Sequence, residues 1–470
     1  MILLWYPEVL VVKKLSMTAS STSRETFCYL LIPDKGFTRL LTLPADEGET
    51  LPMVVLGDFD QWYDVFPIVQ AARTLLDKPV TVLSCLGWQD DSDEPYNVTA
   101  YALDALEGYS GSGRWCRQSE ISAVNPVQRP ILKAWFDWVN NSSALRPPWY
   151  KPGWSQRALA WVDQNLNRLG YRGFGEPQIT QIRARSRACV YRIDTSAGRL
   201  YFKAVPEMFR QEPRLSRWLN EGFPKRTPRI MALNEEEGWM LIRDFGRETL
   251  EQCPDEDCIR KSLSAFGAMQ AQLTVDMEAI RALGVPERRL STIIGEIDSF
   301  AAEIPASYPD LFTASDYALL RDALPLLKQM CLDLEELGIP HSLEHGDFSL
   351  EHVVVSEGGQ EVFFDWANAT ISHPFFSYCT FSDKLRDSYP ALTGETEQSL
   401  ADEYLRHWRS FADETALSQA LIVARPLAAL HQALLYHGRI LPWIEAKWEM
   451  EPALTYYLRK LMEHLRRLEG

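Results

Sequence analysis

Short apolar runs separated by turn signals dominate the first part of the chain. From Tyr29 to about Trp138 these runs read CYLLIP, RLLTLP, PMVVLG and VTVLSCLGW, and they are rich in residues that favour strands. One stretch with helical spacing, residues 61–76, interrupts them. The pattern predicts a small α+β domain over residues 25–139, with an N-terminal extension over residues 1–24 before it.

A proline-rich segment follows this predicted domain. Residues 140–154, NNSSALRPPWYKPGW, combine three prolines with small polar residues, which is typical of a linker. Helical spacing resumes over residues 155–169, and four strand-like runs follow: QITQIRA, CVYRIDT, RLYFKAV and WMLIRDF. A helical segment near Glu212 lies among them, so residues 155–248 are predicted to form a sheet with one inserted helix.

Helical spacing dominates the rest of the chain, residues 249–470. Long helices are predicted over residues 257–283, 291–304 and 315–337. A strand-rich island over residues 345–366 interrupts them, and helices continue to the end. The expected fold class is therefore α+β: a small β-rich lobe and a large helical lobe, preceded by a small α+β domain.

Charge and cysteine usage narrow the partners and the compartment. The 470 residues carry a formal net charge of −16, which disfavours nucleic acid and anionic membrane surfaces and favours a cationic or neutral small molecule. No run of eighteen uncharged apolar residues predicts a membrane span. The eight cysteines show no CxxC spacing, which indicates reduced thiols in a cytoplasmic protein.

The strand-rich island holds the most informative chemistry. Asp347 precedes the run Val353–Val355, and Asp365 follows a second apolar run, residues 362–364. A hairpin that turns near Gly358 and Gly359 would bring both carboxylates to one end of the two strands. One carboxylate could then accept a hydroxyl proton while the other holds a divalent metal. The alternative is that both simply cap backbone amides in turns.

A lysine and a glutamate in the preceding lobe complete the requirements of phosphoryl transfer. Lys203 lies on the strand-like run RLYFKAV, and Glu212 follows nine residues later in a helical segment. A strand lysine paired with a helix glutamate is how kinases orient nucleotide phosphates. Glu207 is an alternative partner for Lys203.

Residues 155–465 resemble the aminoglycoside phosphotransferase and choline kinase superfamily, which is similar in fold to protein kinases. The resemblance rests on four pieces in the expected order: Lys203 with Glu212, a hinge over residues 240–244, His345-Gly346-Asp347, and Asp365-Trp366. It implies a two-lobed protein-kinase-like fold with ATP and Mg²⁺ as cofactors.

The resemblance also implies a role for each of these residues. Asp347 would be the catalytic base or orienter of the acceptor hydroxyl, and Asp365 the chief metal ligand. The remaining residues would bind the nucleotide: Lys203, Glu212, Ser186 in the phosphate-covering loop, and Met240 and Ile242 in the hinge that receives adenine.

Two positions depart from the family pattern. His352 stands where the family has a metal-binding Asn; imidazole can bind a divalent ion, but magnesium prefers oxygen. Macrolide phosphotransferases resemble this HGDxxxxH pattern. The phosphate-covering loop, residues 183–188, reads RARSRA without glycine, so backbone amides near Ser186 and the arginines would meet the phosphates.

The leading domain resembles a Nudix-type layout in its strand order, its helix over residues 61–76 and the later Gly113-Arg114-Trp115. Nudix enzymes need a run of glutamates on that helix to hold metal, and this helix has no Glu pair. The prediction is a degenerate scaffold used for packing, dimerisation or ligand capture.

The leading hypothesis is an ATP-dependent phosphotransferase that acts on a hydroxyl of a small molecule: an antibiotic, an amino alcohol or a sugar. One alternative is a pseudokinase-type protein that binds nucleotide or a partner with little turnover, because of His352 and the glycine-free loop. Another is hydrolase activity in the leading domain. The oligomeric state stays open.

Overall fold

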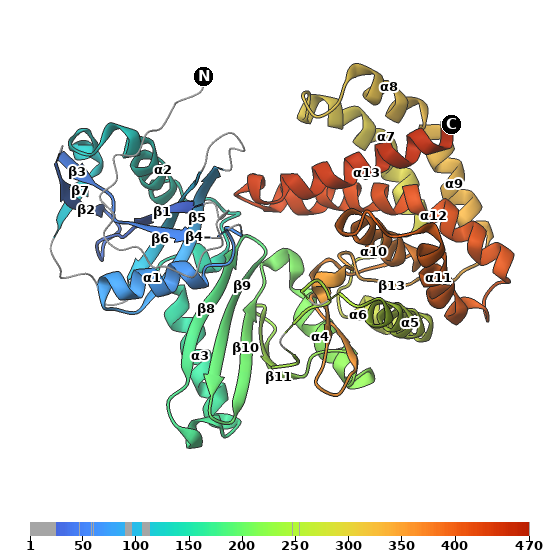
Figure 1. Ribbon diagram of the computed structural model, residues 1–470, viewed down its shortest axis with the longest axis horizontal. Coiled ribbons are helices and arrows are strands. Elements are labelled where there is room, and N and C mark those ends of the chain that lie inside the picture. The colour runs from blue at the N-terminus through green and yellow to red at the C-terminus, as the bar shows by residue number, and fades with distance from the viewer. Residues whose placement is uncertain are drawn as a thin grey trace. The chain divides into compact units, whose positions relative to one another are not determined.

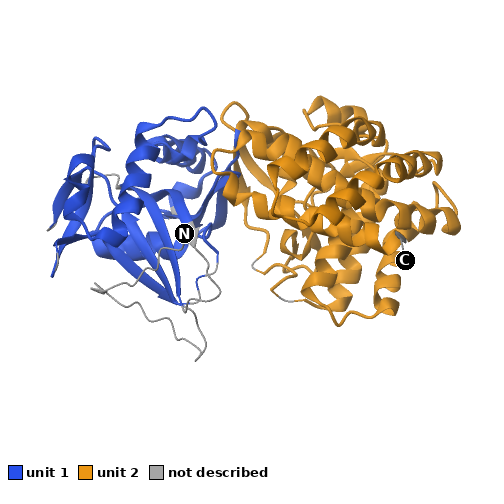
Figure 2. Cartoon of the chain, turned by 90° about the horizontal axis from the view of Figure 1, so that it is seen from above, with its two compact units in different colours: residues 1–206 blue, residues 207–470 orange. Residues whose placement is uncertain are grey.

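The computed structural model describes residues 25–46, 48–57, 59, 61–89, 96–105, 113–246, 248–252 and 254–469. The predicted N-terminal extension, residues 1–24, lies outside the described residues. The chain divides into two compact units, Met1–Pro206 (unit 1) and Glu207–Gly470 (unit 2), which Figure 2 colours separately. In the described part of the chain, no helix is long and apolar enough to cross a membrane.

Unit 1 is rich in strands. Its strands are β1 (Glu25–Leu31), β2 (Arg39–Ala45), β3 (Gly48–Thr50), β4 (Met53–Gly57), β5 (Val80–Gln89), β6 (Tyr96–Ala105), β7 (Arg114–Arg117), β8 (Gln178–Arg185), β9 (Ala188–Thr195) and β10 (Gly198–Ala204). The order β4-β1-β6-β5 forms a mixed sheet in which β1 and β6 run parallel, and β3-β2-β7 forms a second sheet. The predicted strands of this region are confirmed as β1, β2, β4 and β5.

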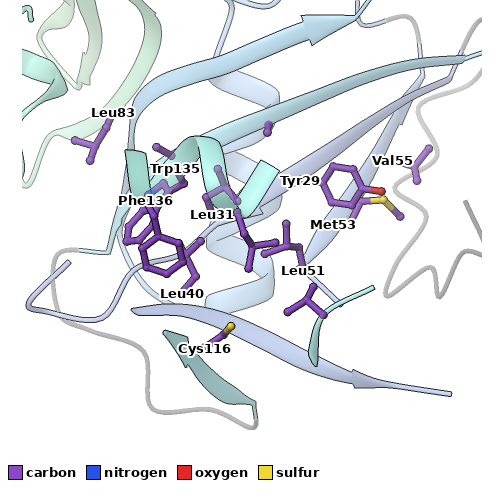
Figure 3. Close-up of a cluster of buried hydrophobic side chains, with 14 residues drawn as sticks. Tyr29, Leu31, Leu40, Leu51, Met53, Val55, Leu83, Cys116, Trp135 and Phe136 are labelled. Carbon is purple, nitrogen blue, oxygen red and sulfur yellow. The ribbon is translucent and has the colours of Figure 1, made fainter. Parts of the chain in front are cut away.

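The prediction of one helix in the leading region is wrong, because α2 (Arg129–Asn140) follows α1 (Phe66–Leu76). Pro130 stands in the first turn of α2, where a missing N–H costs no hydrogen bond, so it starts the helix instead of breaking it. Trp135 and Phe136 of α2 are buried with Leu31 and Leu40 in one apolar cluster (Figure 3). This cluster forms one part of the core of the leading region.

Helix α1 begins five residues later than predicted, because the residues before it bond to strand β8. The amide of Val65 donates to the carbonyl of Ile182 at 3.3 Å, and the amide of Ala184 donates to the carbonyl of Tyr63 at 3.4 Å. The side chain of Gln181 also bonds to both backbone groups of Val82, at 2.7 and 2.9 Å. The leading region and strand β8 are therefore packed together within unit 1.

The proline-rich segment also packs against β8. Trp149 and Tyr150 are buried, and the indole N–H of Trp149 donates to the carbonyl of Arg185 at 3.0 Å. Helix α3 (Trp154–Arg168) follows directly, one residue earlier than predicted. The predicted domain limits at residues 139, 154 and 248 stay a proposal.

Unit 2 is mainly helical (Figure 1). Its helices are α4 (Gln211–Gly222), α5 (Glu256–Leu273), α6 (Met277–Ala282), α7 (Leu290–Ser307), α8 (Ala314–Asp322), α9 (Leu324–Glu336), α10 (Phe375–Ser388), α11 (Gly394–Leu405), α12 (Glu414–Leu435) and α13 (Glu451–Glu469). Two predicted long helices are each broken: residues 257–283 form α5 and α6, and residues 315–337 form α8 and α9, with Pro325 in the first turn of α9.

Short strands interrupt the helices of unit 2. They are β11 (Ile230–Asn234), β12 (Trp239–Arg243), β13 (Ser342–Glu344), β14 (Val353–Val355), β15 (Glu361–Phe363) and β16 (Thr370–Ser372). The predicted hairpin is confirmed: β14 pairs antiparallel with β15, and Gly359 in the turn has φ +70°. The chain is therefore α+β, with a β-rich N-terminal region and a helical C-terminal region, as predicted.

Candidate active site

Tight packing shapes the loop that carries Asp347. The loop leaves β13, which pairs with β16, and Gly346 adopts φ +77° just before Asp347. A Cβ added to Gly346 would lie 2.1 Å from the backbone oxygen of Asn368. Only glycine fits this conformation and this close approach. The loop is thereby held against the segment that follows Asp365.

Asp347 forms an ion pair that the sequence analysis missed. The Nζ atom of Lys384, on α10, donates to Oδ1 of Asp347 at 2.6 Å. Burial lowers the pKa of Lys384, but the charge and hydrogen bond of Asp347 outweigh it, so the pKa is raised and the ammonium stays protonated. The Asp347 side chain is 19% exposed, which leaves it room to meet a ligand.

His352 lies between the two candidate carboxylates. Its Nδ1 lies 2.6 Å from the backbone carbonyl oxygen of Asp347, and a carbonyl only accepts, so Nδ1 carries the hydrogen. In the neutral ring Nε2 is then unprotonated, and it lies 3.8 Å from Oδ2 of Asp365. That separation is too long for a hydrogen bond. The two atoms face each other as a pair of metal donors would; a protonated ring would instead form an ion pair.

Asp365 has a strained backbone. It directly precedes the turn Trp366–Asn368 with φ +66° and ψ +63°, a conformation that a non-glycine residue adopts at a cost. Such strain is concentrated at functional sites, where the surrounding structure holds it. Within the described residues no group of three or more His, Cys, Asp or Glu side chains forms a metal site by itself. A metal at Asp365 and His352 would need further ligands from the substrate or water.

The buried carboxylate of Glu344 supports the loop that carries Asp347. Glu344 accepts hydrogen bonds from the amide of Gly346 at 2.8 Å, from Thr370 at 3.2 Å and from Ser377 at 3.3 Å. Burial raises the pKa of Glu344 to about 7, although these bonds act in the opposite direction. Sequence reasoning missed Glu344, since nothing in the local pattern marks it.

His345 braces the site without a charge of its own. It is fully buried, and its Nε2 donates to the backbone carbonyl of Phe364 at 3.1 Å. Burial lowers the pKa of His345 to about 3, so the ring is neutral at physiological pH. This bond connects the start of the loop that carries Asp347 to Phe364, the residue before Asp365.

The nucleotide residues predicted from the sequence lie in both units. Lys203 is on β10 in unit 1 with 9% exposure, and Glu212 is on α4 in unit 2 with 1% exposure, whereas Glu207 is exposed. The Lys203–Glu212 pair stays a prediction. The hinge residues Met240 and Ile242 are on β12, opposite Leu233 and Ile230 of β11.

The turn predicted to cover phosphate is buried. Ser186 and Arg187, between β8 and β9, are only 2% and 6% exposed. The guanidinium groups of Arg183 and Arg185 lie 5.1 and 5.2 Å from the ring centroid of Tyr63. Cation–π contacts of this kind hold the turn against the leading region. The nucleotide role of Ser186 stays a prediction.

Comparison with known proteins identifies a family. Residues 178–413, just over half of the chain, match the model of the phosphotransferase enzyme family. No curated protein matches the chain.

Several solved structures are similar at low identity. The choline kinase of Streptococcus pneumoniae has 12% identity and a TM-score of 0.45, covering 66% of this chain and 99% of its own. The ethanolamine kinase of Plasmodium vivax has 10% identity and a TM-score of 0.46, covering 72% and 94%. An aminoglycoside phosphotransferase of Streptomyces rimosus has 15% identity and a TM-score of 0.37, covering 57% and 97%.

Proposed function

This chain belongs to the phosphotransferase enzyme family, and on that premise we propose that it transfers the γ-phosphoryl group of ATP to a hydroxyl of a small molecule. The observation that supports the proposal most is the arrangement around the β14–β15 hairpin. There Asp347, His352 and Asp365 are linked by a 2.6 Å hydrogen bond and a 3.8 Å donor pair. These are the groups that in-line phosphoryl transfer requires.

Each residue has a distinct part in the proposed reaction. Asp347 orients the acceptor hydroxyl and accepts its proton, while Lys384 holds the carboxylate in place through their ion pair. Lys203 binds the nucleotide phosphates, and Glu212 positions Lys203. Met240 and Ile242 receive the adenine, and backbone amides near Ser186 meet the phosphates. Transfer then proceeds without a covalent enzyme intermediate.

Asp365 and His352 are the residues that would hold a divalent metal. Oδ2 of Asp365 and Nε2 of His352 lie 3.8 Å apart, and a carboxylate with an imidazole is a donor set that fits such an ion. When bound, Mg²⁺ or a softer ion such as Mn²⁺ neutralises charge on the transferred phosphates. Because imidazole binds Mn²⁺ more readily than Mg²⁺, we propose that His352 broadens metal use beyond magnesium.

A cationic or neutral acceptor suits the surroundings of Asp347. Besides the net charge of −16, two carboxylates lie close together near the site. Burial and the neighbouring Glu351 raise the pKa of Glu251, while the ammonium of Lys384 acts in the opposite direction. An amine on the acceptor would relieve that repulsion. Amino alcohols and aminoglycosides therefore come before neutral sugars as candidates.

The test is ADP release from ATP in the presence of acceptors. Purified protein with ATP and Mg²⁺ or Mn²⁺ is assayed against aminoglycosides, amino alcohols and sugars, with Asp347→Asn as the inactive control. Turnover with an amine-bearing alcohol that Asp347→Asn abolishes supports the proposal. If no acceptor stimulates ADP release and ATP causes no metal-dependent thermal shift, the proposal fails.

Two alternatives make different predictions. A pseudokinase would owe its low turnover to His352, so His352→Asn would raise ATP turnover strongly; we expect a loss with Mn²⁺ instead. The leading region, as a degenerate Nudix-like scaffold, would cleave no nucleoside diphosphate compound. Its helix α1 has no acidic residue in its first turn and no glutamate at all. Metal-dependent cleavage that persists in Asp347→Asn would contradict this reading.

The cysteines support a cytoplasmic location as part of the proposal. Those that the structure describes all have free thiols: Cys28, Cys85, Cys116, Cys189, Cys258, Cys331 and Cys379. Reduced thiols are typical of proteins in a reducing compartment. The expected acceptors, small alcohols, are neither nucleic acid nor membrane.

A further inference from the structure

Unit 2 contains a pocket that none of the proposed catalytic or metal-binding residues lines. It measures about 550 Å³ and lies beside the start of α4, the turn after α6 and the π-helical turn Tyr436–Ile440. Three of its lining residues are arginines, Arg210, Arg214 and Arg439, and its one carboxylate is Glu207. The pocket is therefore a concentration of positive charge in an acidic protein.

The arginines of this pocket differ in how their charge is balanced. Arg214 pairs with Glu235 at 2.7 Å. Arg439 makes no ion pair within the described residues; its guanidinium donates one long hydrogen bond, of 3.4 Å, to the backbone oxygen of Met208. Burial and the nearby charge of Arg288 lower the pKa of Arg439. Arg439 is thus a half-buried cation near Arg288, and among the described residues it pairs with no carboxylate.

Such a charge is unfavourable until an anion meets it. A desolvated cation without a counter-ion costs free energy, and a guanidinium binds phosphate or carboxylate through two parallel hydrogen bonds. Arg210, exposed at the same pocket and without an ion pair in the described part of the chain, adds a second free cation. The pocket supplies what an anionic group needs.

An exposed tryptophan at the same pocket indicates the rest of the ligand. Trp443 lines the pocket and is 58% exposed, which is high for so large an apolar side chain. An aromatic face beside two cations suits a ligand that joins an anionic group to a planar or apolar part.

The pocket shares one residue with the segment of the metal site. Gln211 lines the pocket, and its Nε2 donates to the carbonyl of Ala367 at 3.0 Å, two residues after Asp365. A ligand that shifts Gln211 therefore acts on the turn that holds Asp365. This contact links the pocket to catalysis without any overlap of the two sites.

We propose that this pocket binds a small anionic effector, a phosphate- or carboxylate-bearing molecule with a planar or apolar part, separate from the acceptor. The effector binds to Arg439 and Arg210, packs on Trp443 and changes activity through Gln211. Binding is measured without turnover, so a failure here is distinct from a failure of the proposed function. The effect on activity rests on that function.

The test measures the binding of two probes, phenyl phosphate and inorganic phosphate, to the full chain. The method is titration calorimetry at constant ionic strength. Phenyl phosphate is expected to bind more tightly than phosphate, and Arg439→Gln to weaken both by about tenfold or more. Trp443→Ala should weaken only phenyl phosphate. The matched control is Arg321→Gln, an exposed arginine on α8 paired with Asp322, which should change neither affinity.

Two results would overturn the proposal. If Arg439→Gln binds both probes as the wild type does, the anion binds elsewhere, for example in the nucleotide site. If phenyl phosphate competes with the acceptor in steady-state kinetics, the pocket belongs to the acceptor site. The expected result is a change in kcat that is not competitive with acceptor and that Gln211→Ala reduces while phenyl phosphate still binds.

Discussion

Two regions of unit 2 differ in whether their charged side chains have partners within the fold. Around the β14–β15 hairpin the polar groups have partners within the fold: Lys384 bonds to Asp347, the ring of His352 bonds to the backbone of Asp347, and Glu344 accepts three hydrogen bonds. In the arginine-lined pocket Arg439 has no such partner among the described residues.

The groups of the hairpin region are positioned by the fold itself. The charge of Arg439 in the arginine-lined pocket would instead be compensated by a bound ligand. Preorganised charges cost no rearrangement when a reaction begins, which is what a catalytic site requires. An uncompensated charge is unfavourable alone and becomes favourable on binding, which is what a ligand pocket requires. Removing a charge near the hairpin should therefore lower activity. Removing the charge of Arg439 should leave the free energy of unfolding unchanged or higher.

The largest effect is expected from Asp347→Asn. The amide can neither accept the acceptor's proton nor balance Lys384, so kcat should fall by about a thousandfold while ATP affinity changes little. The measurement is ADP release at saturating acceptor, and the control is Asp322→Asn, an exposed residue on α8. An active Asp347→Asn enzyme would remove the hairpin from the reaction.

A smaller loss is expected from Lys384→Met, since Lys384 is a positioning residue that acts through Asp347. Without the ammonium the Asp347 carboxylate loses the ion pair that positions it, and kcat should fall by about a hundredfold with little change in KM for ATP. Lys384→Arg should restore part of the rate. Lys328→Met, which removes an exposed pair with Asp298, serves as the matched control. A change in KM alone would contradict the positioning role.

Glu344 should make the free energy of unfolding depend on pH. Its pKa of about 7 in the folded protein lies above the ordinary value of a glutamate, 4.5, so the folded state keeps a proton that the unfolded state loses. The free energy of unfolding should therefore fall as pH rises from about 4.5 to 7, by roughly 3 kcal/mol at most. Glu344→Gln cannot titrate, so its stability relative to wild type should rise over that window.

Urea unfolding at pH 5, 6, 7 and 8 measures this effect. The control is Glu357→Gln, an exposed glutamate in the turn of the same hairpin. Parallel pH profiles for the wild type and Glu344→Gln would show that Glu344 is not titrating in the folded protein.

The smallest effect is expected in the other region. Arg439→Gln removes a cation whose charged form the fold disfavours, so the free energy of unfolding should stay within about 0.5 kcal/mol of the wild type or increase. The measurement is urea unfolding without phosphate. A clear loss of stability would mean that Arg439 supports the fold, and the contrast between the two regions would disappear.

The β14–β15 hairpin could be predicted because its signals are local. Asp347 and Asp365 flank two apolar runs separated by Gly358 and Gly359, and this pattern of about twenty residues determines the pairing of β14 and β15. The metal-binding role of His352 stays a prediction. The order of strands before helices in the chain also predicted the α+β class.

The rest depends on contacts between distant segments. Lys384 meets Asp347 only because α10 packs beside the catalytic loop, 37 residues later in the chain. Tyr63 meets Arg183 because the segment before α1 bonds to β8, and no periodicity encodes that contact. The arginine-lined pocket joins Arg210 to Arg439, so its charge imbalance becomes visible only in three dimensions.

Calorimetric titration with ATP, with and without Mn²⁺ or Mg²⁺, tests whether Asp365 binds ATP through a metal and whether Asp347 acts in the transfer. We expect metal-dependent ATP binding that Asp365→Ala weakens by at least about tenfold. Asp347→Asn should bind ATP normally yet not turn it over. Equal ATP affinity with and without metal, or an Asp365→Ala variant that binds like the wild type, would contradict it.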